Sequence, residues 1–461
     1  MPKISYNKNY SILIALFVLW TGISKAQNPL VKDQFTADPS AMVVGGKVYV
    51  YPSHDVYWEE NNGRENWFCM QDYHVFSSEN LTDWTDHGVI LRQENVPWGN
   101  PTANSMWAPD CIERNGKYYF YFPDHSNASS VNGEGFTIGV AVADHPEGPF
   151  VPQEEPIKGV KGIDPNVFID DDGQAYLYWS QGHIYGAKLK ENMLELAASP
   201  VILQELPSKG LKEGPYMFKR NSNYYLTYPH VENRTERLEY ALGENPLGPF
   251  EFKGVIMDES LTGCWTNHHS IISFKGQHYL FYHHNDYSPD FDKNRSIRAD
   301  SLFFEADGSI RKVVPSLRGI GLSSAFEKVH LDRYSELSET GATIGFMDEE
   351  NPFLGWKIIL ENDKGWIKYD AVDFGEVNAL SMTWRVRAPQ GGKAQIRQVS
   401  KEGQLISEVE LVKNEEWQSI TVPLAYRPLG IQDLVLQGSE AVEVDWVRWE
   451  MPKERKGELS E

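Results

Sequence analysis

Short apolar stretches that end in aromatic residues recur along the first two thirds of the chain. Five segments share one plan: a polar or ionisable residue, a short apolar strand, a turn at Gly or Asn, and a second strand that closes on tyrosine. These tyrosines lie 70, 57, 50 and 54 residues apart and are Tyr51, Tyr121, Tyr178, Tyr228 and Tyr282. The turns, such as Gly45-Gly46 and Asn115-Gly116, contain residues that tolerate positive φ. This period, with no helical periodicity between the copies, predicts an all-β fold, a five-bladed β-propeller.

Each copy carries an ionisable residue close to its start. The five are Asp38, Asp110, Asp164, Glu213 and His268. A β-sandwich would show similar strands but would not explain this recurrence, so we expect pseudo-symmetric positions that meet at one mouth of a central channel. A carboxyl group pressed by burial and like charge keeps its proton near neutral pH, whereas a better solvated one stays ionised. An acid and a base facing each other across a small cavity suit the hydrolysis of a glycosidic bond.

The pattern changes in the last third of the chain. Short strands follow one another at intervals of about 10 residues, and residues 380–387 alternate strictly between apolar and polar, which indicates a β-sandwich of jelly-roll type. We therefore predict a signal peptide over residues 1–26, a propeller domain over 27–318, a sandwich domain over 325–451 and a mobile tail over 452–461.

The N-terminus has the pattern of a secretory signal. Lys3 and Lys8 precede an apolar run over residues 12–20, and the small residues Ser24 and Ala26 follow at the positions that a signal peptidase reads. A bilayer needs about 20 apolar residues, so this run is too short to span one. A buried N-terminal helix is the alternative, but nothing polar patterns the run into one face. We expect an exported protein, periplasmic or extracellular, that is soluble and has no membrane span.

Composition narrows the class of partner. The chain has 43 Lys and Arg against 65 Asp and Glu, a formal charge of −22, and nucleic acid is therefore an unfavourable partner. Its three cysteines, Cys69, Cys111 and Cys264, form neither a disulfide framework nor a zinc motif. Aromatic residues make up 13% of the chain, and we expect them to fill the space between strands and to stack on sugar.

Several ordered motifs resemble glycoside hydrolase family 43 over about residues 30–318. They are the strings FTADPSAMV, WAPDCIERNGKYYFYF, GIDPNVFIDDDGQAYLYW, EGPYMFKRNSNYYLTY and SIRADSLFFEADGSI. The resemblance implies a five-bladed propeller and an inverting mechanism. It also implies that Asp38 is the general base, that Glu213 is the general acid, and that Asp164 orients this acid and tunes its pKa.

The same resemblance implies further site residues. Arg298 matches an arginine that reaches the sugar or the acid, and either His268 or His269 matches a central histidine that helps to bind calcium. No organic cofactor is expected. Four aromatic residues are candidates to wall the sugar site because sugar faces stack on rings: Trp107, Phe35, Trp179 and Trp265.

The last third resembles the family 6 carbohydrate-binding modules. The matching strings are GWIKYDAVDFG, WQSITVPL and EVDWVRWE. The chain departs from the pattern at Glu443, where that family has a sugar-contacting Asn. Asp332 and Asp445 are candidate ligands of a structural calcium ion. Whether this domain binds glycan or only buttresses the propeller stays open.

These observations favour an inverting exo-glycosidase that removes terminal α-L-arabinofuranose from arabinoxylan or a similar plant polysaccharide. A β-xylosidase is the alternative within the family, because the two sugars present similar outlines to one pocket. A glycan-binding propeller without catalytic activity is the alternative from another class.

Overall fold

The computed structural model describes residues 27–58, 64–439 and 441–451. The predicted signal peptide and C-terminal tail lie outside these residues. The fold is all-β, as predicted: in the described part of the chain the only helical elements are the short 3₁₀ turns η1 (Gln93–Asn95) and η2 (Pro352–Leu354). None of the described residues forms a helix long and apolar enough to cross a membrane.

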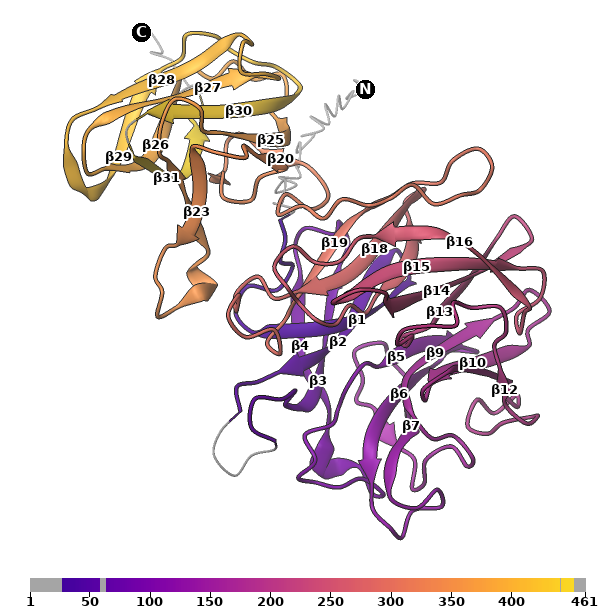
Figure 1. Cartoon of the computed structure of the whole chain (residues 1–461). Coiled ribbons are helices and arrows are strands. Elements are labelled where there is room, and N and C mark those ends of the chain that lie inside the picture. The colour runs from indigo at the N-terminus through magenta and orange to yellow at the C-terminus, as the bar shows by residue number, and fades with distance from the viewer. Residues whose placement is uncertain (1–26, 59–63, 440, 452–461) are drawn as a thin grey trace, which may run out of the picture.

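Five antiparallel sheets follow one another along the first two thirds of the chain (Figure 1). The first contains β1 (Phe35–Val44), β2 (Lys47–Asp55), β3 (Met70–Ser78) and β4 (Thr85–Arg92). The second contains β5 (Asp110–Arg114), β6 (Lys117–Ser126), β7 (Gly135–Ala143) and β8 (Val151–Pro152). The third contains β9 (Ile163–Ile169), β10 (Ala175–Ser180), β11 (Ile184–Lys188) and β12 (Val201–Ile202). The fourth contains β13 (Tyr216–Arg220), β14 (Asn223–Val231), β15 (Glu236–Gly243) and β16 (Phe250–Met257). The fifth contains β17 (Ser270–Phe274), β18 (Gln277–His284) and β19 (Ser296–Leu302).

The first strands of these sheets contact one another in cyclic order. β1 contacts β5, β5 contacts β9, β9 contacts β13, β13 contacts β17, and β17 contacts β1 again. Residues that immediately precede or begin these five strands are therefore brought to one place, although the first and the last of the strands lie more than 200 residues apart in the chain.

Hairpin turns join the first two strands of each sheet where the sequence predicts them. Asn115 and Gly116 have φ of 55° and 75°, and Lys275 and Gly276 have φ of 49° and 83°. Positive φ at both central residues matches the right-handed twist of the flanking strands. The pairing of each hairpin then sets which residue lies opposite its closing tyrosine.

The closing tyrosines account for part of the aromatic content. All five are fully buried. Three of them tie their sheet to the next one by donating hydrogen bonds of 2.7–2.8 Å to backbone carbonyls: Tyr51 to Pro146, Tyr121 to Met193, and Tyr178 to Pro246. The predicted packing of rings between successive sheets is thus present at these positions.

Two six-stranded sheets form the last third of the chain. One contains β20 (Ser323–Ser324), β22 (Glu336–Leu337), β25 (Trp366–Asp373), β27 (Gly392–Gln398), β28 (Leu405–Leu411) and β30 (Ile431–Ser439). The other contains β21 (Val329–His330), β23 (Ala342–Phe346), β24 (Trp356–Leu360), β26 (Ser381–Ala388), β29 (Asn414–Pro423) and β31 (Val442–Trp449). A single apolar cluster takes residues from both sheets, including Tyr369 and Ile396 of the first and Trp384 and Trp449 of the second.

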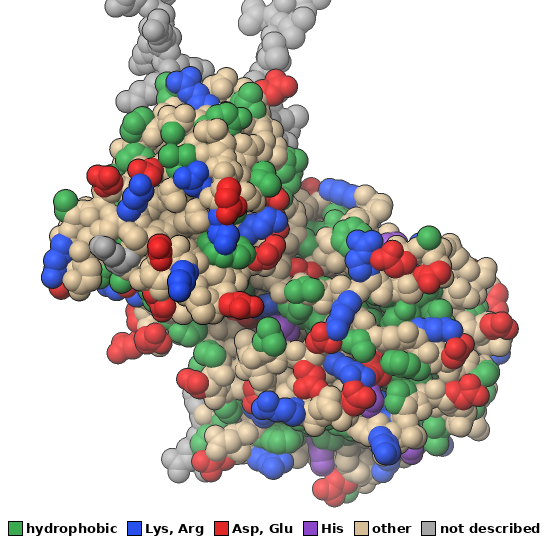
Figure 2. All heavy atoms as spheres, turned by 45° about the horizontal axis from the view of Figure 1, so that its top comes forward, with side chains coloured by type: hydrophobic (Ala, Val, Ile, Leu, Met, Phe, Trp, Pro, Cys, Tyr) green, Lys and Arg blue, Asp and Glu red, His purple; other side chains and the backbone are tan. Residues whose placement is uncertain are grey.

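Aromatic residues join the two parts of the molecule. The rings of Phe35 and Phe353 lie 4.9 Å apart, and Tyr287 stacks on Trp356 at 5.1 Å. The guanidinium of Arg333 lies over the Trp356 ring and donates a hydrogen bond to the Tyr287 hydroxyl. Acidic and basic side chains are interspersed on the face seen in Figure 2, as expected for solvated surface.

Candidate active site

A pocket of about 220 Å³ lies where the first strands of the five sheets meet. Asp38 reaches it from β1 and Asp164 from β9, while Ala108, Glu213 and Asn267 reach it from the segments that precede β5, β13 and β17. The volume is below the range of about 300–1,000 Å³ that is usual for drug-sized ligands, so it suits one sugar ring better than a chain of several.

Strand register explains which residue each sheet contributes. Opposite the closing tyrosine of the first three sheets lie Ser40, Asp110 and Asn166, respectively. Two residues earlier in each copy stand Asp38, Ala108 and Asp164. In the fourth and fifth sheets the strand pairing ends one residue pair short of the closing tyrosine; extended by that one pair, the same step leads to Glu213 and Asn267. All five of these residues line the pocket.

The expectation for Asp110 is therefore wrong. Asp110 lies two residues beyond the pocket position and is buried among the first strands, where it accepts hydrogen bonds from Ser40 Oγ at 2.7 Å and from the Val167 N–H at 2.7 Å. Ser40 and Asn166 likewise accept hydrogen bonds from the N–H groups of Cys111 and Met217 in the next sheet. These equivalent polar residues fasten neighbouring first strands to each other.

Backbone geometry aims Asp38 and Asp164 into the pocket. Both precede a proline and have positive φ, 50° and 57°, which is uncommon outside glycine but more frequent for aspartate. The pairing of β1 with β2 shifts register between Ala37 and Ser40, so a bulge lies at Asp38. Bulges of this kind redirect side chains and are frequent beside active sites.

Asp38 is held as an ion. Its Oδ1 accepts a hydrogen bond from Arg295 Nη1 at 2.9 Å, and its Oδ2 accepts one from Ser53 Oγ at 2.6 Å. Burial alone would raise the pKa of Asp38, but the charge of Arg295, with His283, His268 and the Ser53 hydroxyl, holds that pKa below its usual value. Arg295 is itself fixed by two hydrogen bonds to the buried Asp55. Asp38 is therefore ionised at neutral pH.

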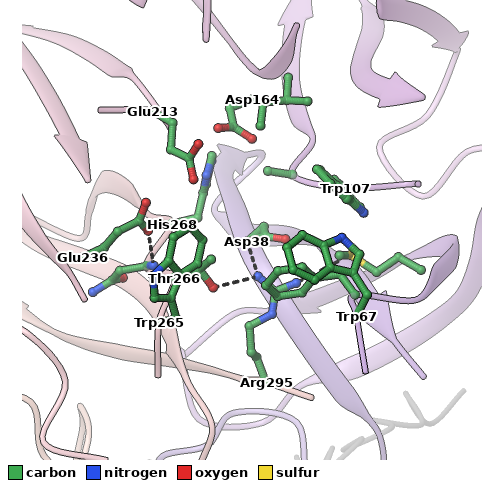
Figure 3. A pocket seen from close by; sticks show the side chains of 15 residues that line it. Asp38, Trp67, Trp107, Asp164, Glu213, Glu236, Trp265, Thr266, His268 and Arg295 are labelled. Atoms are coloured by element: carbon green, nitrogen blue, oxygen red, sulfur yellow. Dashed lines mark hydrogen bonds and ion pairs between the residues drawn. The ribbon is translucent and has the colours of Figure 1, made fainter. Parts of the chain in front are cut away.

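Asp164 and Glu213 have the opposite protonation tendency. Burial, with the negative charges of Glu213 and Asp38, raises the pKa of Asp164 well above its usual value. Burial and the charge of Asp38 also raise the pKa of Glu213. Asp164 Oδ2 accepts a hydrogen bond from the Gly214 N–H at 3.0 Å and so holds the backbone next to Glu213. Figure 3 shows the carboxyl groups of Asp164 and Glu213 turned toward each other, with Asp38 beside Arg295.

A fourth carboxyl group, Glu236 at the start of β15, was not predicted from the sequence. It is 1% exposed, shares a hydrogen bond with Glu213, and accepts a hydrogen bond from the Asn267 N–H at 2.6 Å. Burial and the charge of Glu213 raise the pKa of Glu236 well above its usual value. The raised pKa favours the protonated form of Glu236, in which it can donate the hydrogen bond to Glu213.

Indole rings and an unpaired amide line the rest of the pocket. Trp107 and Trp265 lie on its wall, as predicted, together with Trp67. The side chain of Asn267 is 3% exposed, and neither its Oδ1 nor its Nδ2 has a hydrogen-bond partner among the described residues. Because buried amides are normally satisfied, this one is available to a polar ligand.

The remaining two predicted aromatic residues do not reach the pocket. Phe35 packs against Phe353 of the second part of the molecule. Trp179 is 2% exposed, lies in an apolar core, and donates its indole N–H to the carbonyl of Lys161. Neither ring is placed to stack on a sugar in this pocket.

The predicted arginine also lies elsewhere. Arg298 forms a buried ion pair with Asp286 and lines a second cavity of about 650 Å³ at the junction of the two parts of the molecule. Arg295, three residues earlier, is the arginine that lines the pocket. The family string SIRADSLFFEADGSI begins at Ser296 and contains Arg298, whereas Arg295 lies immediately before that string and before β19.

Of the two candidate histidines, His268 lines the pocket. Burial lowers its pKa to about 4, so it is neutral. His269 is 1% exposed, and its Nε2 lies 2.6 Å from Thr227 Oγ1, away from the pocket. No group of three ligand atoms that includes His268 occurs among the described residues.

The two aspartates predicted to bind calcium in the last third lie beside an arginine and a histidine. Asp332 Oδ2 lies 3.2 Å from Arg333 Nε, and Asp445 Oδ1 lies 3.4 Å from His330 Nδ1. A calcium ion at Asp332 would have to compete with this guanidinium. The described part of the chain holds no three-ligand group at these residues.

The site thus combines one carboxyl group whose pKa is lowered with a group of carboxyl groups whose pKa values are raised. Groups whose environments push their pKa values apart serve as base and acid in one reaction, and hydrolysis of a glycoside requires this pair. Fold and pocket together define a glycoside hydrolase.

Comparison with known proteins gives the family. The family model for glycosyl hydrolases family 43 matches residues 26–310, and the chain belongs to this family. The prediction of a glycoside hydrolase is confirmed.

Curated relatives and solved structures agree with this assignment. The xylosidase/arabinosidase 43A of Humicola insolens is 38% identical over 61% of this chain and 98% of its own length. An arabinoxylan arabinofuranohydrolase of Bacillus subtilis is 28% identical over 85% of each chain. A β-xylosidase/α-arabinofuranosidase from a compost microbial metagenome, solved with xylotriose in a calcium-free form, is similar in structure with a TM-score of 0.55, 36% identity, and coverage of 63% of this chain and 98% of that one.

Proposed function

We propose that this protein is an exo-acting glycosidase that removes terminal α-L-arabinofuranose from arabinoxylan or a similar plant polysaccharide, with inversion at the anomeric carbon. One observation carries this proposal: Arg295 beside Asp38 holds the pKa of that carboxyl group below its usual value, while the pKa of Glu213 is raised across the same small pocket. A pocket for a single ring favours removal of terminal sugars.

Each carboxyl group has its own task in the proposed mechanism. Asp38 removes a proton from a water molecule, which attacks the anomeric carbon from one face of the sugar. Glu213 donates its proton to the departing glycosidic oxygen on the other face. Asp164 holds the backbone beside Glu213 and so orients the acid, while burial and the charge of Asp38 raise the pKa of Glu213. The Asn267 amide and the indoles of Trp107 and Trp265 bind the sugar.

We further propose that the five sheets form a five-bladed propeller and that the last two sheets form a sandwich. The cyclic contacts of the first strands and the single core shared by the last two sheets support this arrangement. A family 43 structure from Bacillus subtilis that covers 92% of this chain, at 24% identity and a TM-score of 0.52, supports the fold of both parts.

The last third of the chain is proposed to buttress the propeller. Glu443, which stands where the family 6 modules have a sugar-contacting Asn, forms two hydrogen bonds of 2.8 Å with Arg387 and an ion pair with Lys357. These partners neutralise its charge and occupy the side chain. The N-terminal pattern supports export, and calcium at the propeller stays a prediction because His268 is the only predicted protein ligand there.

A β-xylosidase is the second candidate, because relatives more than 30% identical carry that name alongside arabinosidase. The β-xylosidase of Xylanibacter ruminicola, for example, is 37% identical over 60% of this chain. One experiment separates the candidates. The protein is incubated with arabinoxylan and with xylo-oligosaccharides, and the released sugar and its first anomer are identified by NMR.

Initial release of β-arabinofuranose from arabinoxylan supports the proposal. Initial release of α-xylose supports the alternative. Release of neither sugar by a folded protein that still binds the glycan would support the non-catalytic lectin instead. An initial product with the anomeric configuration of the substrate would contradict inversion.

A further inference from the structure

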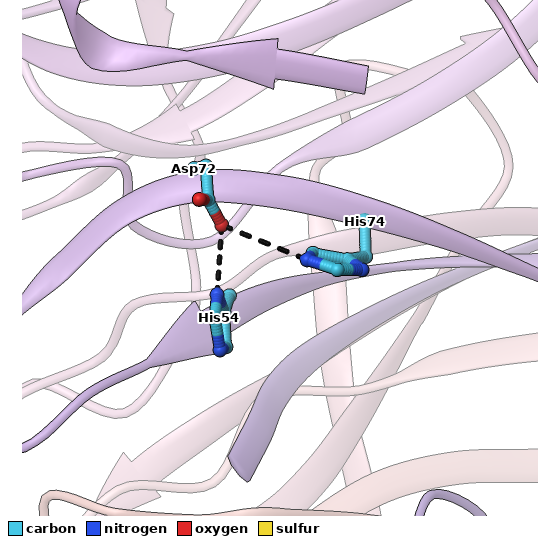
Figure 4. Close-up of side chains that lie close together, drawn as sticks. All are labelled: His54, Asp72 and His74. Carbon is cyan, nitrogen blue, oxygen red and sulfur yellow. Dashed lines mark hydrogen bonds and ion pairs between the residues drawn. The ribbon is translucent and has the colours of Figure 1, made fainter. Parts of the chain in front are cut away.

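Two histidines and one aspartate cluster on the first sheet, where His54 points to the face of β2 opposite to that of Ser53 and Asp55. Within the described part of the chain, His54, Asp72 and His74 are the one set of His, Cys, Asp and Glu side chains whose ligand atoms all lie within 4.8 Å of one another. His54 lies on β2, and Asp72 and His74 lie on β3. Figure 4 shows both imidazoles and the carboxylate turned toward a common point.

The spacing of these ligand atoms is close to that of a tetrahedral metal site. Asp72 Oδ1 lies 2.8 Å from His54 Nδ1 and 3.9 Å from His74 Nε2. Ligands that bind Zn²⁺ at about 2.0–2.1 Å lie roughly 3.3 Å from each other in a tetrahedral site. The two separations fall on either side of this value, so small side-chain rotations would complete the geometry.

A second carboxylate orients one of the imidazoles. His74 Nδ1 lies 3.1 Å from both carboxylate oxygens of Asp86, which is held in turn by the Gly88 N–H and the amide of Gln34. In the neutral tautomer of His74 that has its N–H on Nδ1, the Nε2 lone pair faces Asp72 Oδ1, so two acceptors face each other. Histidines that bind metals almost always donate their other ring N–H in this way. A cation between the two acceptors would remove their repulsion.

The remaining contacts leave the third ligand free to turn toward an ion. Arg92 Nη1 binds Asp72 Oδ2 at 3.2 Å, which leaves Oδ1 for the histidines. The Arg92 side chain is half exposed, so water weakens its repulsion of a cation. Side chains of His54 and His74 are partly exposed, and solvent therefore reaches the cluster.

We propose that His54, Asp72 and His74 form a site for a divalent transition-metal ion of the zinc class, with a water molecule as the fourth ligand. Two imidazoles and one carboxylate suit Zn²⁺, whereas Ca²⁺ and Mg²⁺ prefer oxygen ligands throughout. The ion would bridge β2 and β3. The opposite face of β2 carries Ser53 and Asp55, which hold Asp38 and Arg295, so an ion here stabilises the strand behind the catalytic base.

Zinc binding by the untagged full chain tests the proposal. Equilibrium dialysis at micromolar zinc and neutral pH should give one bound ion per chain, with Mg²⁺ and Ca²⁺ unable to displace it. His54→Ala and His74→Ala should each lower the affinity at least about 10-fold. His87→Ala is the matched control, because His87 is an exposed histidine of the same sheet that lies outside the cluster and contacts Ser77. It should bind zinc as the wild type does.

Thermal unfolding provides the second measurement. Added zinc should raise the unfolding temperature of the wild type and of His87→Ala but not of His54→Ala or His74→Ala, since an ion that binds only the folded state stabilises it. If an alanine variant does not fold, His54→Gln and Asp72→Asn replace it, with circular dichroism as the check. Absence of bound zinc in the wild type, or equal affinity in the wild type and both histidine variants, would overturn the proposal.

Discussion

Arg295 donates a hydrogen bond from Nη1 to Oδ1 of Asp38 over 2.9 Å, in a position where both side chains are almost wholly buried. Asp38 is the aspartate that the sequence singles out as a base, and Arg295 supplies the charge that keeps it ionised. Replacing Arg295 therefore tests whether the low pKa of Asp38 matters for catalysis.

Arg295→Lys should lower kcat/KM by about 10²-fold or more, because a lysine cannot bridge Asp38 and Asp55 as the planar guanidinium does. It should also shift the acidic limb of the pH profile. Arg295 lowers the pKa of Asp38, so losing this contact raises that pKa, and activity should fall at a higher pH than in the wild type. Arg298→Lys is the matched control: it disrupts a buried ion pair with Asp286 but lies at the other cavity. A shift of the acidic limb in the control as well would contradict the assignment.

Glu236 is expected to act through Glu213. Glu236→Gln keeps a hydrogen-bond donor of the same size, so kcat should stay within about 3-fold of the wild type. Glu236→Leu removes the donor. The hydrogen bond to the carboxylate that forms on Glu213 when it gives up its proton is then lost, which should cost about 10-fold or more in kcat.

Loss of Glu236 should also shift the pH dependence of activity in one direction. The hydrogen bond from Glu236 lowers the pKa of Glu213, so in Glu236→Leu the pKa of Glu213 rises and the basic limb moves to higher pH. Pre-steady-state or kcat/KM pH profiles of both variants measure this shift. Equal profiles for Gln and Leu would show that Glu236 is only a packing residue.

Asn267 should bind substrate without supporting the fold. Because neither polar atom of its side chain has a partner among the described residues, Asn267→Ala should change the free energy of unfolding by less than about 0.5 kcal/mol. Loss of a hydrogen bond to a sugar hydroxyl should lower kcat/KM by about 2- to 10-fold, mostly through KM. Urea unfolding and steady-state kinetics together check this. A large loss of stability with an unchanged KM would contradict the role.

Substitution of Trp107 is expected to affect substrate binding, whereas substitution of Trp179 is expected to affect the stability of the fold. Trp179 lies in an apolar core, so Trp179→Ala should cost about 3–5 kcal/mol of unfolding free energy and leave the KM of the folded fraction unchanged. Trp107 is half-buried at the pocket wall, so Trp107→Ala should raise KM. The opposite pattern in either variant would show that the pocket is not the sugar site.

The repeats in the sequence predict much of this site because equivalent positions of a repeated hairpin meet at one place. Asp38, Asp164 and Glu213 are found in this way. Aligning the copies on their first ionisable residue fails for Asp110, because strand register counted from the closing tyrosine selects Ala108 instead. In the fifth copy the register selects Asn267, and the neighbouring His268 also lines the pocket.

Other residues of the site do not stand at an equivalent position of the sequence repeats. Glu236 and Arg295 begin or precede strands β15 and β19, and Trp67 lies in a connection between strands. Their approach to the pocket depends on how the sheets are arranged in space, which no local pattern encodes. The pairing of Phe35 with Phe353 is likewise a contact between two parts of the molecule.

The leaving-group dependence of Glu213→Gln tests the central claim most directly. The variant keeps the size of the side chain but has no proton to donate, so hydrolysis of arabinoxylan should fall by about 10²–10⁴-fold, and the fall of activity at high pH should disappear. On an aryl arabinofuranoside whose leaving group needs no protonation, such as 2,4-dinitrophenolate, the rate should stay within about 10-fold of the wild type. Equal losses on both substrates, or wild-type rates on arabinoxylan, would contradict the assignment of Glu213 as the acid.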